Sequence, residues 1–137
     1  ISQLKQLEQF NKRRREIVDF YKNELADLKA IKLPTPAPWE HTHSWHIFTP
    51  LIDIDYLGMT RDDFMTKMKE RNIGTALHYQ ALHLFTCFHE VTGLGRGDLP
   101  EAEYVSDRIL SLPLFPAMTD EDTVDVVRAV RDICEGK

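Results

Sequence analysis

The chain has 137 residues, a net charge of −5 and a hydrophobic fraction of 42%. This length suits a single domain whose core needs no disulfide or metal support. The acidic balance argues against a nucleic-acid-binding surface, and the apolar runs are too short to span a bilayer. We expect Cys87 and Cys134 to be free, buried thiols in a reducing compartment such as the cytoplasm.

A long helix is predicted over residues 1–30, because no Gly or Pro interrupts a helical pattern of apolar residues. Arg14 falls on the apolar stripe, so this face is expected to pack against another domain or subunit. The chain opens inside the helical pattern, which suggests a piece of a longer protein. A Pro-rich connector is predicted at residues 31–43. The apolar positions of the helix are Leu4, Leu7, Val18, Tyr21, Leu25 and Leu28.

The rest of the chain alternates expected strands and helices. Apolar patterns and turn residues predict strands at 44–53, 73–77 and 109–115. Helices are predicted at 60–72, at 82–91, after Asp98 and from Thr119 to Cys134. The expected fold class is therefore α+β, with a small sheet of about three strands covered by helices.

Five of the six histidines fall into two groups along the chain. The first group, His41, His43 and His46, lies at the start of the first expected strand. No cysteine or carboxylate with familiar spacing completes a tetrahedral zinc site there. Hydrogen-bonded histidines are the better interpretation, so no metal site is predicted.

The second group lies in the stretch from Leu77 to His83, just past an expected strand, where loops carry function. His78, Tyr79 and His83 offer donors and acceptors that suit sugar hydroxyls or a phosphate. We take these three as candidate substrate-binding residues. By spacing alone, a structural role for them is equally well supported.

Several ordered blocks together resemble the carboxy-terminal third of the DegT/DnrJ/EryC1/StrS family of sugar aminotransferases, over nearly the whole chain. The blocks are Gln3-Leu4, Arg13-Arg14-Arg15, Trp39-Glu40-His41, Ser44-Trp45-His46-Ile47-Phe48, Thr60-Arg61-Asp62, Ile73-Gly74-Thr75-Ala76-Leu77-His78-Tyr79, Arg108-Ile109-Leu110-Ser111-Leu112-Pro113-Leu114-Phe115-Pro116 and Met118-Thr119.

The resemblance implies the small carboxy-terminal domain of a fold-type-I enzyme that uses pyridoxal 5′-phosphate (PLP). Family members work as homodimers and move an amino group from glutamate to a keto group of a nucleotide-linked sugar. His78 matches a family histidine near substrate and cofactor, and Tyr79 and His83 match its neighbours. The likeness favours a UDP-linked 4-keto pentose, although relatives use many 3- and 4-keto hexoses.

The same chemistry identifies what the chain lacks. PLP needs a lysine that forms a Schiff base, and the lysines here lie on expected helices, in the connector or at the end. In the family, this lysine and the phosphate-binding turn lie upstream, in an amino-terminal domain. We therefore expect residues 1–137 to form one domain that neither binds PLP nor turns over substrate alone, so no catalytic residue is assigned.

Two other functions remain open at this point. The chain could be an independent binding module that uses the groove between His78 and His83 and the helix face around Arg14. It could instead belong to a non-catalytic, PLP-binding regulator of the same family in which the lysine has been lost.

Overall fold

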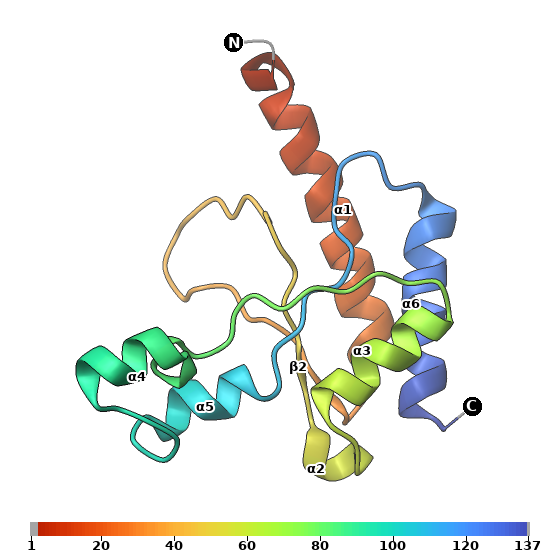
Figure 1. Ribbon diagram of the computed structural model, residues 1–137. Coiled ribbons are helices and arrows are strands. Elements are labelled where there is room, and N and C mark those ends of the chain that lie inside the picture. The colour runs from red at the N-terminus through yellow and green to blue at the C-terminus, as the bar shows by residue number, and fades with distance from the viewer. Residues whose placement is uncertain (1–2, 137) are drawn as a thin grey trace.

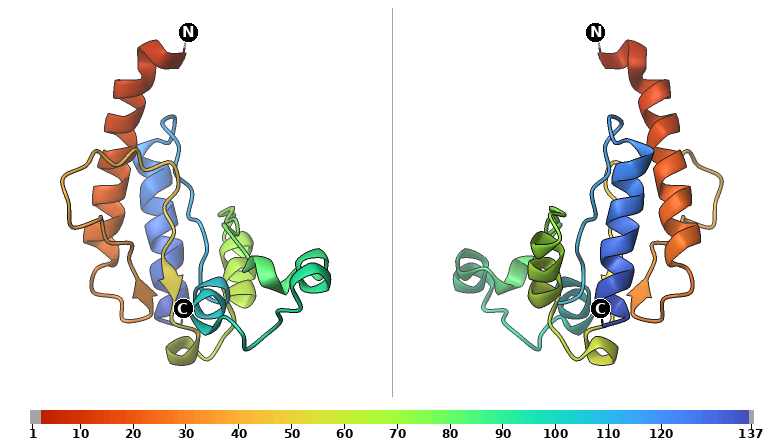
Figure 2. Two further views of the ribbon diagram at one scale, coloured as in Figure 1. Left: turned by 90° about the vertical axis from the view of Figure 1, so that its left-hand side faces the viewer. Right: turned by 90° about the vertical axis from the view of Figure 1, so that its right-hand side faces the viewer.

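Two long helices pack along each other in the computed structural model, which describes residues 3–136 (Figures 1 and 2). They are α1 (Leu7–Leu25) and α6 (Asp120–Cys134), and each buries one apolar stripe against the other elements. A capping box starts α6, because the side chains of Thr119 and Asp122 accept each other's backbone N–H. The expected helix from Thr119 to Cys134 is confirmed.

The first helix is shorter than the 1–30 expected from the sequence. Its described part begins with a 3-10 turn, η1 (Gln3–Gln6), and the helix ends at Leu25. The chain then leaves the helix through two turns, in which Leu28 N–H donates to Leu25 and Ile31 N–H donates to Leu28. Leu28 continues the apolar spacing, but as part of a turn. Residues 1 and 2 of the predicted helix lie outside the described residues.

A narrow antiparallel ladder lies at the centre. Strand β1 (Ile31–Lys32) pairs with β2 (Leu51–Ile52), and Ile31 faces Ile52. Strand β1 falls inside the predicted connector at 31–43, so the sequence-based assignment of its first residues was wrong. Two prolines lie in the predicted strands, and since proline has no N–H to donate, ladder pairing is short around Pro50 and Pro113.

Isolated bridges extend the ladder sideways. Phe48 pairs with Leu112, Leu51 with Ile109 and Ala76 with Ser111. The lateral order is therefore β1, then β2, then the segment at 109–112, then Ala76. The three predicted strands are neighbours, as expected for one sheet, but each is reduced to a strand of two residues or to single bridges. The α+β class with a long first helix is confirmed.

The core fills the space between this ladder and the helices. Phe48 from the ladder side and Phe64 and Met68 from α3 (Arg61–Glu70) are fully buried. A second capping box, formed by Thr60 and Asp63, starts α3. The short helix α2 (Ile54–Leu57) links β2 to α3.

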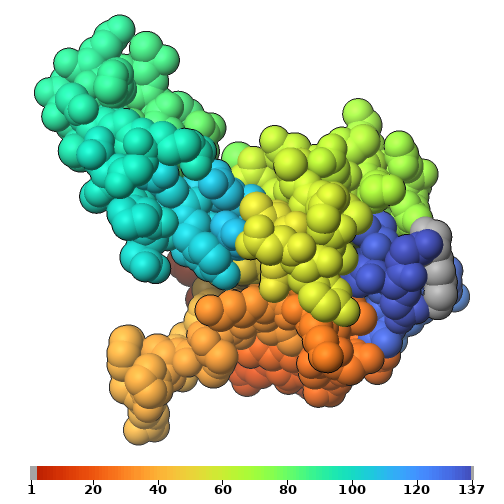
Figure 3. Space-filling model, turned by 90° about the horizontal axis from the view of Figure 1, so that it is seen from below, coloured from red at the N-terminus to blue at the C-terminus, as the bar shows by residue number. Residues whose placement is uncertain are grey.

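Residues 78–107, here called the arm, project from this body (Figure 3). The arm contains η2 (Leu82–Leu84), α4 (Thr86–Thr92) and α5 (Pro100–Ser106). The single helix predicted at 82–91 is wrong, since extended backbone at Phe85 separates a 3-10 turn from α4. Cys87 on α4 is exposed, not buried as expected, and both cysteines are free. The exposed apolar side chains of the arm include Leu82, Phe85, Phe88, Val91, Leu94, Leu99, Tyr104 and Val105.

The first turns of α1 extend past the end of α6 (Figure 2). Leu4 and Leu7 are exposed there, and Arg14 donates a 2.9 Å hydrogen bond to the side chain of Asn11. A cavity of about 660 Å³ lies between this part of α1 and the loop that carries Phe115. The predicted contact of the Arg14 face with another domain or subunit stays a prediction. No helix among residues 3–136 is both long and apolar enough to cross a bilayer.

Candidate functional site

His78 and Tyr79 lie together where the chain leaves the ladder. Nδ1 of His78 lies 2.7 Å from Oγ of Ser111, and the Tyr79 ring meets the imidazole edge-on with 4.9 Å between centroids. The peptide bond between His78 and Tyr79 is cis. His78 is half-buried, whereas Tyr79 is 72% exposed. The pair therefore presents one oriented imidazole and one phenol at the surface, at the base of the arm.

His83 occupies a different environment. It is buried inside the arm, where Nε2 lies 3.1 Å from a carboxylate oxygen of Glu103. The same oxygen accepts the backbone N–H groups of Gly97 and Leu99. Burial raises the pKa of Glu103, but the hydrogen bonds from His83, Gly97 and Leu99 outweigh it and hold the pKa below its ordinary value. His83 thus fixes the arm, and its predicted role toward substrate stays a prediction.

Two buried serines, Ser106 and Ser111, form hydrogen bonds in this region, and neither was predicted from the sequence as a site residue. The hydroxyl of Ser111 contacts His78, and that of Ser106 accepts a 2.9 Å hydrogen bond from the backbone N–H of Ala81. Their partners lie far away in the sequence, so no local spacing points to them. The one available signal was a serine between Leu110 and Leu112, since a polar residue there needs a hydrogen-bond partner.

Two members of the first histidine group, His41 and His43, contact each other's rings, and His43 also contacts the ring of Trp45. Nδ1 of His43 accepts the backbone N–H of Trp45 at 2.9 Å, and the two rings lie 4.0 Å apart. Nζ of Lys22 lies 4.5 Å from the centroid of the Trp45 ring. Burial, His41 and Lys22 lower the pKa of His43. No set of three or more His, Cys, Asp or Glu side chains within residues 3–136 could hold a metal ion.

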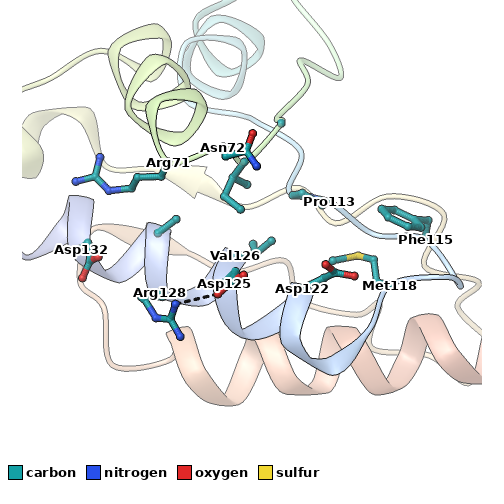
Figure 4. Close-up of a pocket in the computed structure, with 13 residues that line it drawn as sticks. Arg71, Asn72, Pro113, Phe115, Met118, Asp122, Asp125, Val126, Arg128 and Asp132 are labelled. Atoms are coloured by element: carbon teal, nitrogen blue, oxygen red, sulfur yellow. Dashed lines mark hydrogen bonds and ion pairs between the residues drawn. The ribbon is translucent and has the colours of Figure 1, made fainter.

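A cavity of about 500 Å³ opens between the end of α3 and α6 (Figure 4). Asp122, Asp125 and Asp132 line it from α6, and Arg128 pairs with Asp125 at 2.9 Å. Carboxylates outnumber guanidinium groups in the lining, so the cavity is a poor receptor for a phosphate or a nucleotide. His78 and Tyr79 do not line it, and we place no site there.

The lysines do not fit a Schiff-base site. Among residues 3–136 no lysine is buried, and only Lys22, whose amine lies over the Trp45 ring, is half-buried. An amine that is to react at neutral pH needs a desolvated or otherwise perturbed setting. The described residues therefore offer no lysine in a setting suited to anchor PLP.

A family model matches residues 1–131, and its description is the DegT/DnrJ/EryC1/StrS aminotransferase family. The chain belongs to this family. A putative sugar aminotransferase from Streptococcus pneumoniae, Spr1654, has been solved in a PLP form and in a PMP form, PMP being the amino form of the cofactor. The PLP form matches 98% of this chain with a TM-score of 0.87 at 20% identity, which shows a common fold.

Other relatives have higher identity. An uncharacterized protein of Methanocaldococcus jannaschii, MJ1066, is 43% identical over 97% of this chain. DesV of S. venezuelae, solved in complex with a ketimine intermediate, matches 96% of the chain at 32% identity with a TM-score of 0.85. The chain spans only about a third of the length of each, 34% in both cases.

Proposed function

We propose that this chain is the carboxy-terminal small domain of a PLP-dependent nucleotide-sugar aminotransferase. The observation that carries the proposal is the family match over residues 1–131, together with coverage of only about a third of the relatives. The absence of a buried lysine among the described residues fits this, because the cofactor anchor would then lie in the rest of the protein.

In this proposal, His78 and Tyr79 contact the nucleotide-linked sugar. Their support is geometric: the imidazole is held by Ser111 on one side and by the Tyr79 ring on another, and Tyr79 is largely exposed. Such a pair can donate and accept hydrogen bonds toward hydroxyl, carbonyl or phosphate oxygens. His83 acts indirectly, by holding the arm through Glu103.

The whole protein would move an amino group from glutamate, which leaves as 2-oxoglutarate, to the keto group of the sugar. We propose a homodimer in the cytoplasm. The substrate we propose is a UDP-linked 4-keto pentose, as for UDP-4-amino-4-deoxy-L-arabinose–oxoglutarate aminotransferase, which the sequence blocks around Ser44–Phe48 and Arg108–Pro116 resemble.

The test compares His78→Ala with wild type in the longer protein that the native gene encodes. We expect PLP uptake to be unchanged and the KM for the sugar nucleotide to rise by about tenfold or more, since a hydrogen bond to a charged or polar ligand group is lost. His46→Ala is the matched control, because His46 is exposed and belongs to the other histidine group. Unchanged kinetics in His78→Ala would remove His78 from the site.

The alternative is a non-catalytic member of the family or an independent binding module. A longer gene product that takes up PLP but transfers no amino group from glutamate would support the non-catalytic family member, which would act as a PLP-binding regulator. A native gene that encodes only these residues would support the module, whose contact surface would include the apolar flank of the arm, with Phe85 and Phe88.

A further inference from the structure

The hydrogen bond between Ser111 and His78 joins two parts of the chain that the ladder brings together. Ala76 and Ser111 exchange both backbone hydrogen bonds, at 3.2 and 2.7 Å. His78 follows two residues later, and its Nδ1 reaches the Ser111 hydroxyl at 2.7 Å. The backbone pairing therefore fixes the serine at one side of the imidazole.

The direction of this hydrogen bond follows from counting donors. A serine hydroxyl has one proton, and Ser111 is 6% exposed, so that proton needs a protein acceptor. Within residues 3–136, the one hydrogen-bond partner of Oγ is Nδ1 of His78. If Nδ1–H donated to Oγ, the hydroxyl proton would be buried without an acceptor. The favourable arrangement has the hydroxyl donating to an unprotonated Nδ1.

A neutral imidazole that accepts at Nδ1 carries its proton on Nε2. We propose that Ser111 is a positioning residue that holds His78 in this Nε2–H tautomer, so that the ring presents a donor to the substrate. The group recognised is then an oxygen acceptor, namely a carbonyl, phosphate or hydroxyl oxygen, and not an amine donor. The ligand part of this inference rests on the proposed function, whereas the tautomer does not.

The tautomer can be read directly by NMR on the 137-residue chain labelled with 15N-histidine. Long-range 1H–15N correlation at about pH 8.5, where free imidazole is neutral, separates a protonated from an unprotonated ring nitrogen. His78→Gln assigns the signals. We expect His78 of the wild type to be protonated at Nε2 only, and protonation at Nδ1 would overturn the proposal without any need for a serine variant.

Ser111→Ala should move both ring nitrogen shifts of His78 toward those of free imidazole, in which the tautomers exchange. Ser106→Ala is the matched control, because Ser106 is equally buried but binds the backbone N–H of Ala81 and no imidazole. His78 shifts that stay the same in folded Ser111→Ala would also overturn the proposal.

The role of the tautomer in substrate binding is tested by kinetics in the longer protein that the native gene encodes. Ser111→Ala should raise the KM for the sugar nucleotide about tenfold, because the donor is no longer fixed in direction, and Ser106→Ala should raise it less. A Nε2–H tautomer with no kinetic effect of Ser111→Ala would overturn the substrate role and leave the tautomer standing. A longer protein without aminotransferase activity would contradict the proposed function instead.

Discussion

The phenol hydroxyl of Tyr21 donates a 2.8 Å hydrogen bond to the carbonyl oxygen of Pro113. This hydrogen bond connects the C-terminal part of α1 to the chain just after the ladder. Tyr21 is fully buried, and burial together with Asp122 raises its pKa above the ordinary range, so the hydroxyl keeps its proton. The relationship explains why a tyrosine occupies an apolar stripe.

Tyr21→Phe should lower the free energy of unfolding by about 1 kcal/mol, the usual net value of one hydrogen bond whose acceptor is left without its partner. Urea unfolding monitored by circular dichroism measures this. Tyr56→Phe is the control, since Tyr56 is 61% exposed. Equal stability of the two variants would mean that the bond to Pro113 contributes nothing.

Phe48→Ala should destabilise the fold by about 3–5 kcal/mol, because a fully buried aromatic side chain leaves a cavity in the core. Phe48 packs against Tyr21 at a centroid distance of 5.4 Å, so repacking from α1 is limited. Phe88→Ala removes the same atoms from an exposed position on the arm and should change stability little. Thermal unfolding of both variants measures the two changes in stability, and equal changes would contradict the prediction.

The buried pair of His83 and Glu103 predicts a pH dependence. The pKa of Glu103 is lower in the folded chain than its ordinary value, so folding is favoured with the carboxylate ionised. This stability is present above the ordinary glutamate pKa of about 4.3 and is lost as the pH falls through the lower folded value. We expect the Tm to fall between about pH 5 and pH 3.

Glu103→Gln isolates this contribution. The variant should be less stable near neutral pH, and its Tm should fall less on acidification than that of wild type. The acidic residues Asp63 and Asp122, whose pKa values are also lowered by capping hydrogen bonds, remain in both proteins and supply the shared part of the fall. Parallel curves for the two proteins would contradict the assigned role of Glu103.

The two cysteines should differ in reactivity. Burial first, and then Glu135, raise the pKa of the Cys134 thiol to about 11, whereas Cys87 is exposed on the arm. Since the thiolate is the reactive form, iodoacetamide at about pH 8 should modify Cys87 at least tenfold faster than Cys134. Peptide mass spectrometry after timed quenching measures both rates, and denatured chain gives the control in which both react.

The sequence was informative where local chemistry decides the structure. Thr119 and Asp122 predict a capped helix, and that helix is present from Asp120 to Cys134. It was less informative at the ladder, because pairing depends on partners far along the chain. Ile31 looked like part of a connector and pairs with Ile52, while Pro50 and Pro113 shorten the strands around them.

In the candidate site, too, local features were predictable from the sequence, whereas contacts between distant residues were not. His78 and Tyr79 stood out in the sequence, and they do lie together at the surface. His83 has the same residue type but is buried against Glu103, a partner that no spacing rule identifies. Ser111 was missed because its neighbour in space is distant in the sequence.

The exposed apolar side chains of the arm should promote self-association of this chain. Phe85, Phe88 and Val91 are 40%, 43% and 85% exposed, and Glu103 accepts a hydrogen bond from the Gly97 backbone in the loop that follows α4. A larger fraction of copies should associate through these exposed side chains as protein concentration rises, and sulfate salts should strengthen the apolar attraction between copies. Low protein concentration and low sulfate therefore favour separate chains over associated copies.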